Sequence, residues 1–572
     1  MASKALIAGV LVLVLIVAAA AVISTQRGEE AQPTETAASP TPAQTTPKRE
    51  TTPAETTTPE RETPVEAPKQ ELVFVYGTTQ PTATFDPAKA RDETELMSVI
   101  NTYDPLVYPS REGVKPWVAE RWESNEDATE WTFYIRKGIK FHSGRELTAE
   151  DVAFSMERAL AIKAGFSFLW IDIVDRVEVV DRYTVKFYLK EPYAEFPATL
   201  AVFFIVDKEE VLANIKDGPF GEYGDYGQEW LSQNDAGSGP YRVVKFERGK
   251  EIVFEKFDDY WAGWKPGAPD RVVVRVVGEQ ATLVSMLRRG EVDMVEQWLP
   301  ADIFEQLKKE QGIVVQEDPT AQLFFVSMHN KKPPFDDVNV RLAVAHAVDY
   351  ESIINFVFKG GVQAEGPVPL IAPGHCPVPK PTFDLEKAKE YLAKSKYKIS
   401  PENPVTVEFV YVAGLQVEEQ VGLILKQNLE KLGINVELRP EPWARIVELA
   451  KTPETTPHMV AIFHTLKFPS PDSHTYLMFH PNAHGTYISI MWYENPRVTE
   501  LLDKARRTVD PEERYRLYCE VQKIVTEEAA SLFIINPMHR IAYRDYVKGY
   551  EYVGILGFDL RFSNLDISAK YG

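Results

Sequence analysis

The chain has 572 residues, of which 44% are hydrophobic and 26% charged, and its formal net charge at pH 7 is -21. A chain of this length exceeds what one hydrophobic core supports, so two or more lobes are expected. The negative charge argues against nucleic acid as a partner, because binding phosphates requires clustered lysine and arginine.

Residues 1–24 are expected to form a membrane anchor or a signal sequence. Residues 5–23 are uncharged and mostly apolar, which is long enough for one helix through a bilayer. A secretory signal usually has a shorter apolar stretch of about 7–15 residues, so a retained anchor is favoured over a cleaved signal. Either outcome places the rest of the chain outside the cytoplasm, anchored to the cytoplasmic membrane or secreted.

Residues 25–70 are expected to form a disordered linker rich in threonine and proline. Between residues 33 and 68 there are 11 threonines and 8 prolines, and the only large aliphatic residue is Val65. Such a segment buries too little apolar surface to offset the entropy lost on ordering. Its prolines favour an extended spacer.

From residue 72 onward the sequence alternates between strand-like and helix-like patterns. Trp131, Phe133 and Ile135 alternate as in a half-buried strand, and residues 148–151 have the spacing of a capping box. Strands are expected at 72–76, 131–135, 177–180, 184–189, 241–246, 252–257, 272–277, 323–328, 405–412, 434–438 and 532–535. Helices are expected over 148–162, 281–289, 342–358, 384–392, 417–432 and 511–528.

A rigid elbow follows the strand at 323–328. Pro333 and Pro334 stop regular structure, because each lacks a backbone donor. Asp337 is expected to cap the helix that follows by accepting the free amides of its first turn. Arg341 is expected to bind a nearby carboxylate such as Asp336 rather than a ligand.

Common catalytic signatures are absent from the sequence. It contains no Gly-x-Ser-x-Gly, no His-Glu-x-x-His and no phosphate-binding loop of the Walker type. We therefore expect no enzyme, no cofactor and no catalytic residue. Cys376 and Cys519 are the only cysteines, which excludes a thiolate metal cage. They either pair with each other or remain two buried free thiols.

Five histidines crowd one region, but scattered loop histidines are a commoner outcome than a metal site, so no metal is expected. They are His458, His464, His474, His480 and His484.

Several aromatic residues fall at the ends of predicted elements or in loops, where an aromatic face can hold the apolar side of a sugar or a peptide side chain. For each one taken singly, core packing is favoured over ligand binding. These residues are Trp170, Trp298, Trp443, Tyr487 and Trp492.

Seven short motifs in a fixed order resemble those of solute-binding protein family 5, the extracytoplasmic receptors of oligopeptide, dipeptide and nickel ABC importers. The resemblance covers about 500 residues. The motifs are Phe85-Asp86-Pro87-Ala88, Phe141-His142-Ser143-Gly144, Thr148-Ala149-Glu150-Asp151-Val152, Gly237-Ser238-Gly239-Pro240-Tyr241, Asp259-Tyr260-Trp261, Arg289-Gly290-Glu291-Val292-Asp293 and Pro334-Phe335-Asp336-Asp337-Val338-Asn339-Val340-Arg341.

The resemblance implies an α/β fold, a two-lobed clamshell of the periplasmic-binding-protein type with an extra subdomain in the first lobe. Residues 71–325 would form lobe I, 326–535 lobe II, and 536–572 would return to lobe I. A small solute would bind between the lobes and pass to the permease of an ABC importer, driven by its ATPase subunits. A peptide is the favoured cargo, an oligosaccharide is the alternative, and a stalked cell-surface protein without transport is the rival function.

Lys467 is the main departure from the family's pattern. An aspartate at this place in the peptide binders grips the terminal ammonium of the peptide, and a lysine would repel it. Asp472 would substitute if the loop register differs. The resemblance further suggests Thr79, Gln80 and His464 as ligand-binding residues, together with Lys467 and the aromatic residues named above.

Overall fold

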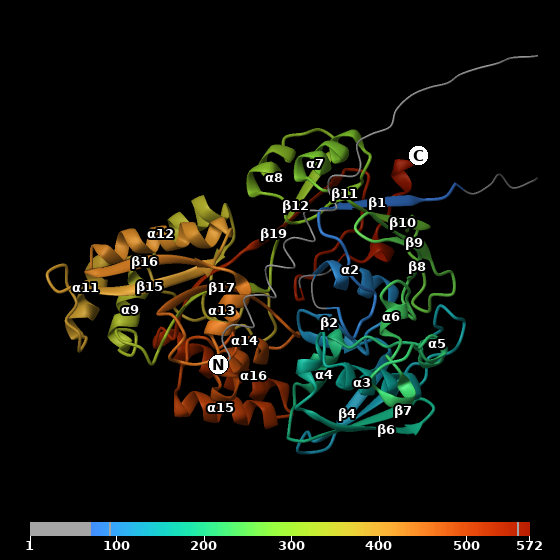
Figure 1. Cartoon of the computed structure of the whole chain (residues 1–572), viewed down its shortest axis with the longest axis horizontal. Helices are drawn as coiled ribbons and strands as arrows, with labels where there is room; N and C mark the ends of the chain where they lie inside the picture. The colour runs from blue at the N-terminus through green and yellow to red at the C-terminus, as the bar shows by residue number, and fades with distance from the viewer. Residues whose placement is uncertain (1–69, 91–92, 557–559) are drawn as a thin grey trace, which may run out of the picture. The chain divides into compact units, whose positions relative to one another are not determined.

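The computed structural model describes residues 70–90, 93–556 and 560–572. The chain divides into two units, Met1–Pro68 and Lys69–Gly572, and the folded body is the second (Figure 1). The anchor and the linker predicted for residues 1–24 and 25–70 lie outside the described residues. Within the described part, none of the helices has the length and apolarity needed to cross a bilayer.

A seven-stranded mixed sheet holds both early and late segments of the folded body. Strand β1 runs parallel to β10 and β11, whereas β19, near the C-terminus, pairs antiparallel with β11 and β12. In order of pairing the strands are β12 (Ile313–Pro319), β19 (Met538–Arg544), β11 (Met294–Val295), β1 (Val73–Thr78), β10 (Arg271–Val276), β9 (Glu251–Lys256) and β8 (Tyr241–Glu247).

A six-stranded sheet forms the other large layer. Its strands β15 and β16 are parallel and are joined by α12 (Gln416–Glu430), which confirms the β-α-β unit expected from the sequence. The strands, in order of pairing, are β14 (Val362–Gln363), β18 (Ser531–Asn536), β13 (Gln322–Met328), β17 (Met459–Thr465), β15 (Val405–Val412) and β16 (Ile434–Glu441).

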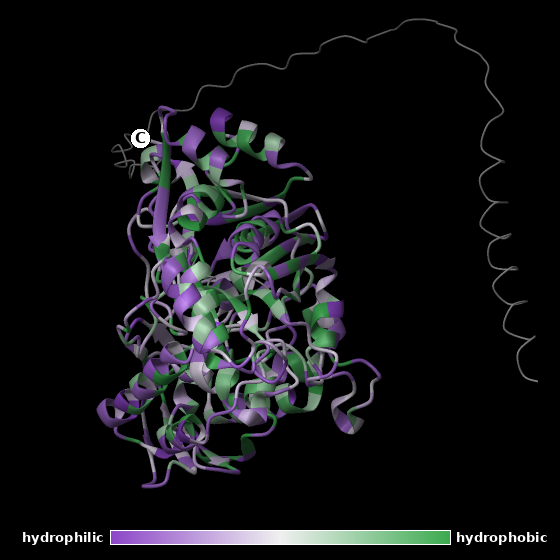
Figure 2. Cartoon of the chain, turned by 90° about the vertical axis from the view of Figure 1, so that its left-hand side faces the viewer, coloured by the Kyte–Doolittle hydropathy of each residue, from purple (hydrophilic) through white to green (hydrophobic). Residues whose placement is uncertain are grey.

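Alternate residues of β13 enter different cores, because successive side chains of a strand point to opposite faces. Phe324 and Val326 pack with α9, α11 and α12, whereas Leu323 and Phe325 pack with α13 to α16. Figure 2 shows helices that carry both hydrophobic and hydrophilic residues. The helices are α9 (Val338–Ala347), α11 (Leu385–Lys394), α13 (Trp443–Leu449), α14 (Asp472–Phe479), α15 (Pro496–Arg507) and α16 (Pro511–Glu527).

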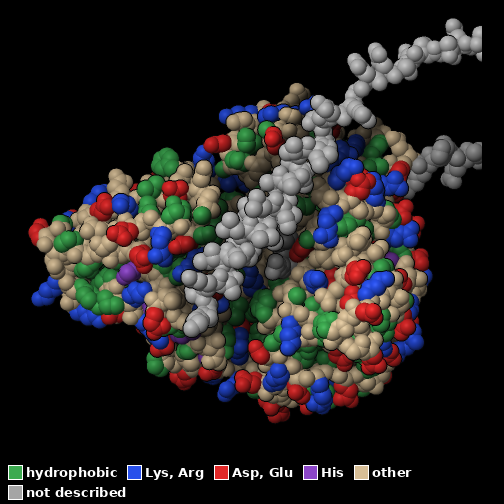
Figure 3. Space-filling model, viewed as in Figure 1, with side chains coloured by type: hydrophobic (Ala, Val, Ile, Leu, Met, Phe, Trp, Pro, Cys, Tyr) green, Lys and Arg blue, Asp and Glu red, His purple; other side chains and the backbone are tan. Residues whose placement is uncertain are grey.

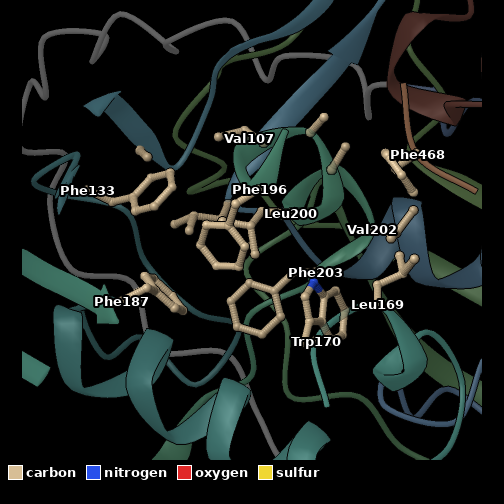
Figure 4. Close-up of a cluster of buried hydrophobic side chains, with 14 of the residues drawn as sticks. Val107, Phe133, Leu169, Trp170, Phe187, Phe196, Leu200, Val202, Phe203 and Phe468 are labelled. Atoms are coloured by element: carbon tan, nitrogen blue, oxygen red, sulfur yellow. The ribbon is translucent and has the colours of Figure 1, made fainter. Parts of the chain in front are cut away.

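A four-stranded antiparallel sheet and its helices form a further layer, with a dense aromatic core shown in Figure 4. The capping box before α3 (Ala149–Ile162) is present, since Thr148 N–H donates to the Asp151 carboxylate at 2.9 Å. The strands are β4 (Ala119–Ser124), β5 (Glu130–Ile135), β7 (Thr184–Leu189) and β6 (Val174–Asp181), beside the hairpin of β2 (Val107–Ser110) and β3 (Gly113–Pro116). The other helices that precede β12 in the chain are α2 (Glu93–Thr102), α4 (Phe196–Thr199), α5 (Lys208–Ala213), α6 (Gln228–Leu231), α7 (Gln280–Arg289) and α8 (Ala301–Leu307).

The elbow is present, but one prediction about its helix is wrong. Asp337 caps α9 by accepting the Asn339 N–H at 2.8 Å. The continuous helix expected over 342–358 breaks at Val348, which is extended. Asp349 accepts the Ser352 N–H at 3.0 Å and starts a new turn, because a short polar side chain competes for backbone amides. The chain continues as α10 (Tyr350–Ser352) and a π-helical segment, Ile353–Phe358.

The predicted partner of Arg341 is also wrong. Its guanidinium donates to the backbone carbonyls of Phe335 at 2.9 Å and Glu528 at 3.1 Å. Asp336 instead accepts from Lys396 Nζ at 2.8 Å and from the Tyr397 hydroxyl at 2.5 Å. The buried carbonyls at the end of α16 lack helical partners, and a buried guanidinium with five donors satisfies them.

The two cysteines are bonded to each other and are not free thiols. Cys376 and Cys519 form a disulfide with their Cα atoms 5.3 Å apart and a separation of 143 positions in the sequence. Cys519 lies on α16, so the bond fixes the loop around Cys376 to the helices that cover the six-stranded sheet.

Candidate functional site

A pocket lies where the chain passes between the two large sheets. The first passage, between β12 and β13, is Thr320–Ala321, and the second, between β18 and β19, is Pro537. The Thr320 hydroxyl donates to the Pro537 carbonyl at 2.7 Å and so fastens the two passages together. The junction pocket has about 90 Å³ of space and is lined by Gln297, Trp298, Thr320, Ala321, Gln322, Thr465, Met538, His539, Arg540, Tyr552 and Gly554.

His539 is the central polar residue of this junction pocket. Its Nδ1 contacts the Gln297 side-chain oxygen, its Nε2 lies 2.9 Å from the Tyr550 hydroxyl, and its ring stacks on Tyr552 with centroids 3.9 Å apart. Burial lowers the pKa of His539 to about 3, so the imidazole is neutral at physiological pH. Arg540 donates to Glu317 at 2.7 Å, and its charge is therefore matched within the protein.

The structure brings three of the predicted site residues, Thr79, Gln80 and Trp298, to one edge of the seven-stranded sheet. β1 and β11 are parallel neighbours, so their carboxyl ends meet at the same edge. Glu296 accepts the Thr79 N–H at 2.8 Å and its hydroxyl at 2.6 Å, and the Gln80 N–H donates to the Thr78 hydroxyl at 3.0 Å. Trp298 follows two residues after Glu296 and is 52% exposed.

An exposed tryptophan, Trp443, packs against the half-buried Tyr487 on the side of the six-stranded sheet. Their ring centroids lie 4.8 Å apart in an edge-to-face arrangement, and Trp443 is 41% exposed at the start of α13. An exposed tryptophan held in place by a second ring can contact an apolar part of a ligand.

His464 and Lys467 lie at and just after the end of β17. His464 is 1% exposed, and its Nε2 contacts the Ser473 carbonyl at 2.9 Å. Burial, helped by the Lys467 ammonium, lowers the pKa of His464 to about 3. Lys467 is half-buried, and its backbone N–H donates to the Ser473 hydroxyl at 2.9 Å. Thr465, between these two residues, lines the junction pocket.

Asp472 does not have the free carboxylate that binding an ammonium would require. It is fully buried and accepts from Arg506 at 2.7 Å, from Tyr518 at 2.9 Å and from Tyr193 at 3.1 Å. Its oxygens are therefore occupied within the protein.

Trp170 and Trp492 are buried and pack in the hydrophobic cores. Trp170 packs against Phe203 (Figure 4) with ring centroids 5.5 Å apart, and it donates to the Thr199 hydroxyl at 3.1 Å. Trp492 is 8% exposed and donates to the Thr456 hydroxyl at 2.9 Å. Among the described residues, no three or more His, Cys, Asp or Glu side chains are placed to hold a metal ion.

Sequence reasoning missed several residues that line the junction pocket, above all Gln322, His539 and Tyr552. Gln322 and His539 lie in strands whose sequence pattern gives no sign of a pocket, and it is the change of sheet at Thr320–Ala321 and Pro537 that places them there. A proline between two strands, Pro537, was the one available signal.

Comparisons with known proteins agree over most of the chain. A model of the family described as bacterial extracellular solute-binding proteins, family 5 Middle, matches residues 113–486. The probable D,D-dipeptide-binding periplasmic protein DdpA of Escherichia coli is 29% identical over 84% of this chain and 92% of its own length. The dipeptide-binding protein of the same organism is 29% identical over 76% of this chain and 83% of its own.

Solved structures show the same fold. The periplasmic binding protein DppA of Helicobacter pylori, in complex with the peptide STSA, has a TM-score of 0.69 and 25% identity, and the match covers 87% of this chain and 98% of that one. CtaP of Listeria monocytogenes has a TM-score of 0.75 at 21% identity, covering 87% and 99%. The expected α/β, two-lobed periplasmic-binding-protein fold is thereby confirmed.

Proposed function

Because the chain belongs to family 5 of the bacterial extracellular solute-binding proteins, we propose that it captures a peptide between two lobes and delivers it to the permease of an ABC importer. Members of this family bind solutes outside the cytoplasm and are not enzymes. The observation that carries the proposal is the match over residues 113–486 together with a pocket at the junction of the two large sheets.

We divide the folded body into lobe I, residues 71–325 and 536–572, and lobe II, residues 326–535. Support comes from the two passages, Thr320–Ala321 and Pro537, which lie a few residues from these bounds and at which consecutive strands belong to different sheets. A solute that contacts both sheets would shift an equilibrium between open and closed arrangements toward the closed one. The size of the shift is limited by the difference in affinity between the two arrangements.

A peptide of the dipeptide or oligopeptide kind is the cargo that the relatives favour, since proteins named for dipeptide binding in Escherichia coli are 29% identical. Lys467 limits how such a peptide binds. An ammonium beside it would be repelled, so the amino terminus of the peptide lies elsewhere.

We further propose that residues 1–24 anchor the protein and that residues 25–70 act as a spacer between the membrane and the folded body. The permease and the ATPase subunits of the importer are the implied partners. Fractionation of cells that express the full chain, and a variant lacking residues 1–24, tests the anchor. Release of the full chain into the soluble extracytoplasmic fraction would contradict it.

Native mass spectrometry followed by thermal-shift measurements tests the cargo. Dipeptides, tripeptides and longer peptides are compared with oligosaccharides. We expect peptides to raise the melting temperature and to reduce the radius of gyration in small-angle scattering, because a closed arrangement is more compact. Stabilisation by oligosaccharides alone would overturn the peptide assignment, and an unchanged radius with a bound solute would overturn closure.

The variant Lys467→Asp tests the role assigned to this residue. We expect tighter binding of peptides with a free amino terminus, because a carboxylate attracts the ammonium that lysine repels. The matched control is Lys389→Asp on the exposed surface of α11, which should leave the affinity unchanged. An unchanged affinity in Lys467→Asp would show that the residue does not face the cargo.

A further inference from the structure

A long irregular segment, residues 364–384, joins β14 to α11, and we call it the strap. It contains six prolines, whose fixed φ angles limit the conformations that the chain can adopt. Although it forms neither helix nor strand, much of it is buried, including Val368, Ala372 and Cys376. Irregular segments of this length are uncommon inside compact domains, and those that are ordered usually carry a function.

The later part of the strap is fixed to α16. Cys376 is bonded to Cys519 of that helix. Gln522, three residues further along α16, accepts the Cys376 N–H at 3.1 Å and donates to the Gly374 carbonyl at 2.8 Å. Because α16 covers the six-stranded sheet, this end of the strap is part of the proposed lobe II.

The middle of the strap is attached to both passages through one buried side chain, Asn536. The Leu370 N–H donates to the Asn536 side-chain oxygen at 3.2 Å, and the Asn536 side-chain nitrogen donates to the Gln322 carbonyl at 3.0 Å. Asn536 directly precedes the second passage, Pro537, and Gln322 directly follows the first. Leu370 lies only six positions before the disulfide-bonded Cys376.

The strap also contacts the wall of the junction pocket. Gly554 lines that pocket and accepts the N–H of Ala321, a residue of the first passage, at 2.9 Å. Ile371 lies against Gly554, since a Cβ added to the glycine would be 2.7 Å from Ile371 Cδ1. The strap therefore leaves no room for a side chain at position 554.

Apolar side chains of the strap are buried together with residues of the proposed lobe I. Val368 and Ala372 belong to the same hydrophobic core as Leu556, and so does Phe468 (Figure 4), which follows Lys467. Separating the lobes at the two passages would either displace the strap or expose these side chains to water, which is unfavourable. Opening thus requires the strap to move.

We propose that the strap controls the opening between the lobes, and that the disulfide between Cys376 and Cys519 sets how strongly it resists. Anchored to α16, the strap holds both passages in the arrangement described above and so slows the release of a captured solute. The proposal rests on the closure of two lobes proposed above. A disulfide that only fastens a surface loop would leave the passages unaffected when it is removed.

Hydrogen–deuterium exchange of the full-length protein, without any added peptide, tests the proposal. In a variant that carries both Cys376→Ser and Cys519→Ser, we expect the amides of Ala321 and Leu370 to exchange at least about tenfold faster, because the passages open more often. The amides of β8 and β9, at the far edge of the seven-stranded sheet, should be unchanged. Faster exchange confined to residues 374–384, or spread evenly over the protein, would overturn the proposal.

Two further variants separate control of the passages from a general loss of stability. Val407→Ala truncates a side chain buried in a different core, and it should lower the melting temperature without selectively speeding exchange at Ala321. Ile371→Ala removes the contact with Gly554 but keeps the disulfide, and it should speed exchange at Ala321. Combined with the cysteine substitutions it should add little, because both changes act through the strap. Independent, multiplying effects would contradict this.

Binding of trialanine and pentaalanine distinguishes the strap from the peptide function. We expect pentaalanine to dissociate at least about tenfold faster from the double cysteine variant, with little change in its association rate. If these peptides bind and reduce the radius of gyration but the variant leaves exchange at the passages unchanged, the strap proposal is wrong and the peptide function stands. If the passages respond as expected but neither these peptides nor those tested above bind, the peptide function is wrong and the strap stands.

Discussion

Two buried carboxylates, Asp472 and Asp104, are both fully inaccessible to solvent but use their cations differently. Both carboxylate oxygens of Asp472 accept hydrogen bonds from the Arg506 guanidinium, from Nε at 3.1 Å and from one Nη at 2.7 Å. Asp104 receives four neutral donors, and Arg561 remains 3.9 Å away. Asp472 is therefore held mainly by a cation, whereas Asp104 is held mainly by neutral donors.

The surroundings of Asp472 extend this contrast. Arg514 on α16 contacts Glu195 at 2.5 Å, and the Ala194 N–H donates to the Arg506 carbonyl at 2.6 Å. These contacts tie residues 193–195, just before α4, to the helices that cover the six-stranded sheet. The charges around Asp472 therefore hold two layers of the folded body together.

The largest expected effect is that of Asp472→Asn. The substitution leaves Arg506 buried without its counterion, and breaking a buried ion pair typically costs about 3–5 kcal/mol. Urea denaturation of the full chain, with the free energy of unfolding as the readout, measures it. Asp104→Asn should cost clearly less, because neutral donors supply most of the contacts of Asp104. An equal loss in both variants would remove the distinction between the two groups.

Acid should weaken the Asp472 region through the buried histidine beside it, His464. The folded-state pKa of His464, about 3, lies below its ordinary value of 6.5. Below pH 6.5 the unfolded chain takes up a proton that the folded chain does not, so stability falls as the pH drops toward 3. At pH 5 the expected loss from this residue is about 2 kcal/mol. His464→Gln should flatten this acid limb in urea titrations, whereas an unchanged slope would refute the assignment.

Arg561→Gln should change the free energy of unfolding by only about 1 kcal/mol, because the arginine makes no close hydrogen bond to Asp104. Thermal and urea denaturation measure this, beside Arg506→Gln as the matched variant of the Asp472 pair. A loss as large as that of Arg506→Gln would mean that Asp104 depends on its cation as much as Asp472 does.

The smallest effect is expected at an exposed ion pair. Lys140 and Asp259 lie 2.7 Å apart with side chains 49% and 59% exposed, in a surface where charges of both signs are interspersed (Figure 3). Exposed pairs contribute about 0–1 kcal/mol, so Lys140→Gln should leave the urea midpoint nearly unchanged. This variant sets the baseline for the buried groups, and a loss as large as that of Asp472→Asn would invalidate the comparison.

Local sequence signals predicted much of the fold. The strand 405–412 and its parallel partner followed from hydrophobic runs separated by a helix that ends before Gly433. Asp510, followed by a proline, caps α16 as expected and accepts the Glu513 N–H at 2.8 Å. These features are decided within a few residues of each other, which is why a pattern reveals them.

Contacts between distant residues escaped the same reasoning. Arg561 lies 457 positions after Asp104, and His539 lies 242 positions after Gln297, counted from their residue numbers. Tertiary packing decides such contacts. Likewise, an apolar repeat continues past Val348, but the local cap at Asp349 broke the helix that the repeat predicted.

The bond between Cys376 and Cys519 has a consequence for how the protein withstands proteases. It joins residues 143 positions apart and closes a loop that contains β15, α12, β16, β17 and α15. A single proteolytic cut in an exposed turn of that loop leaves the two fragments covalently joined. They should migrate as one species in a non-reducing gel and separate when the disulfide is reduced. Outside the cell, one nick would therefore not release half of the lobe.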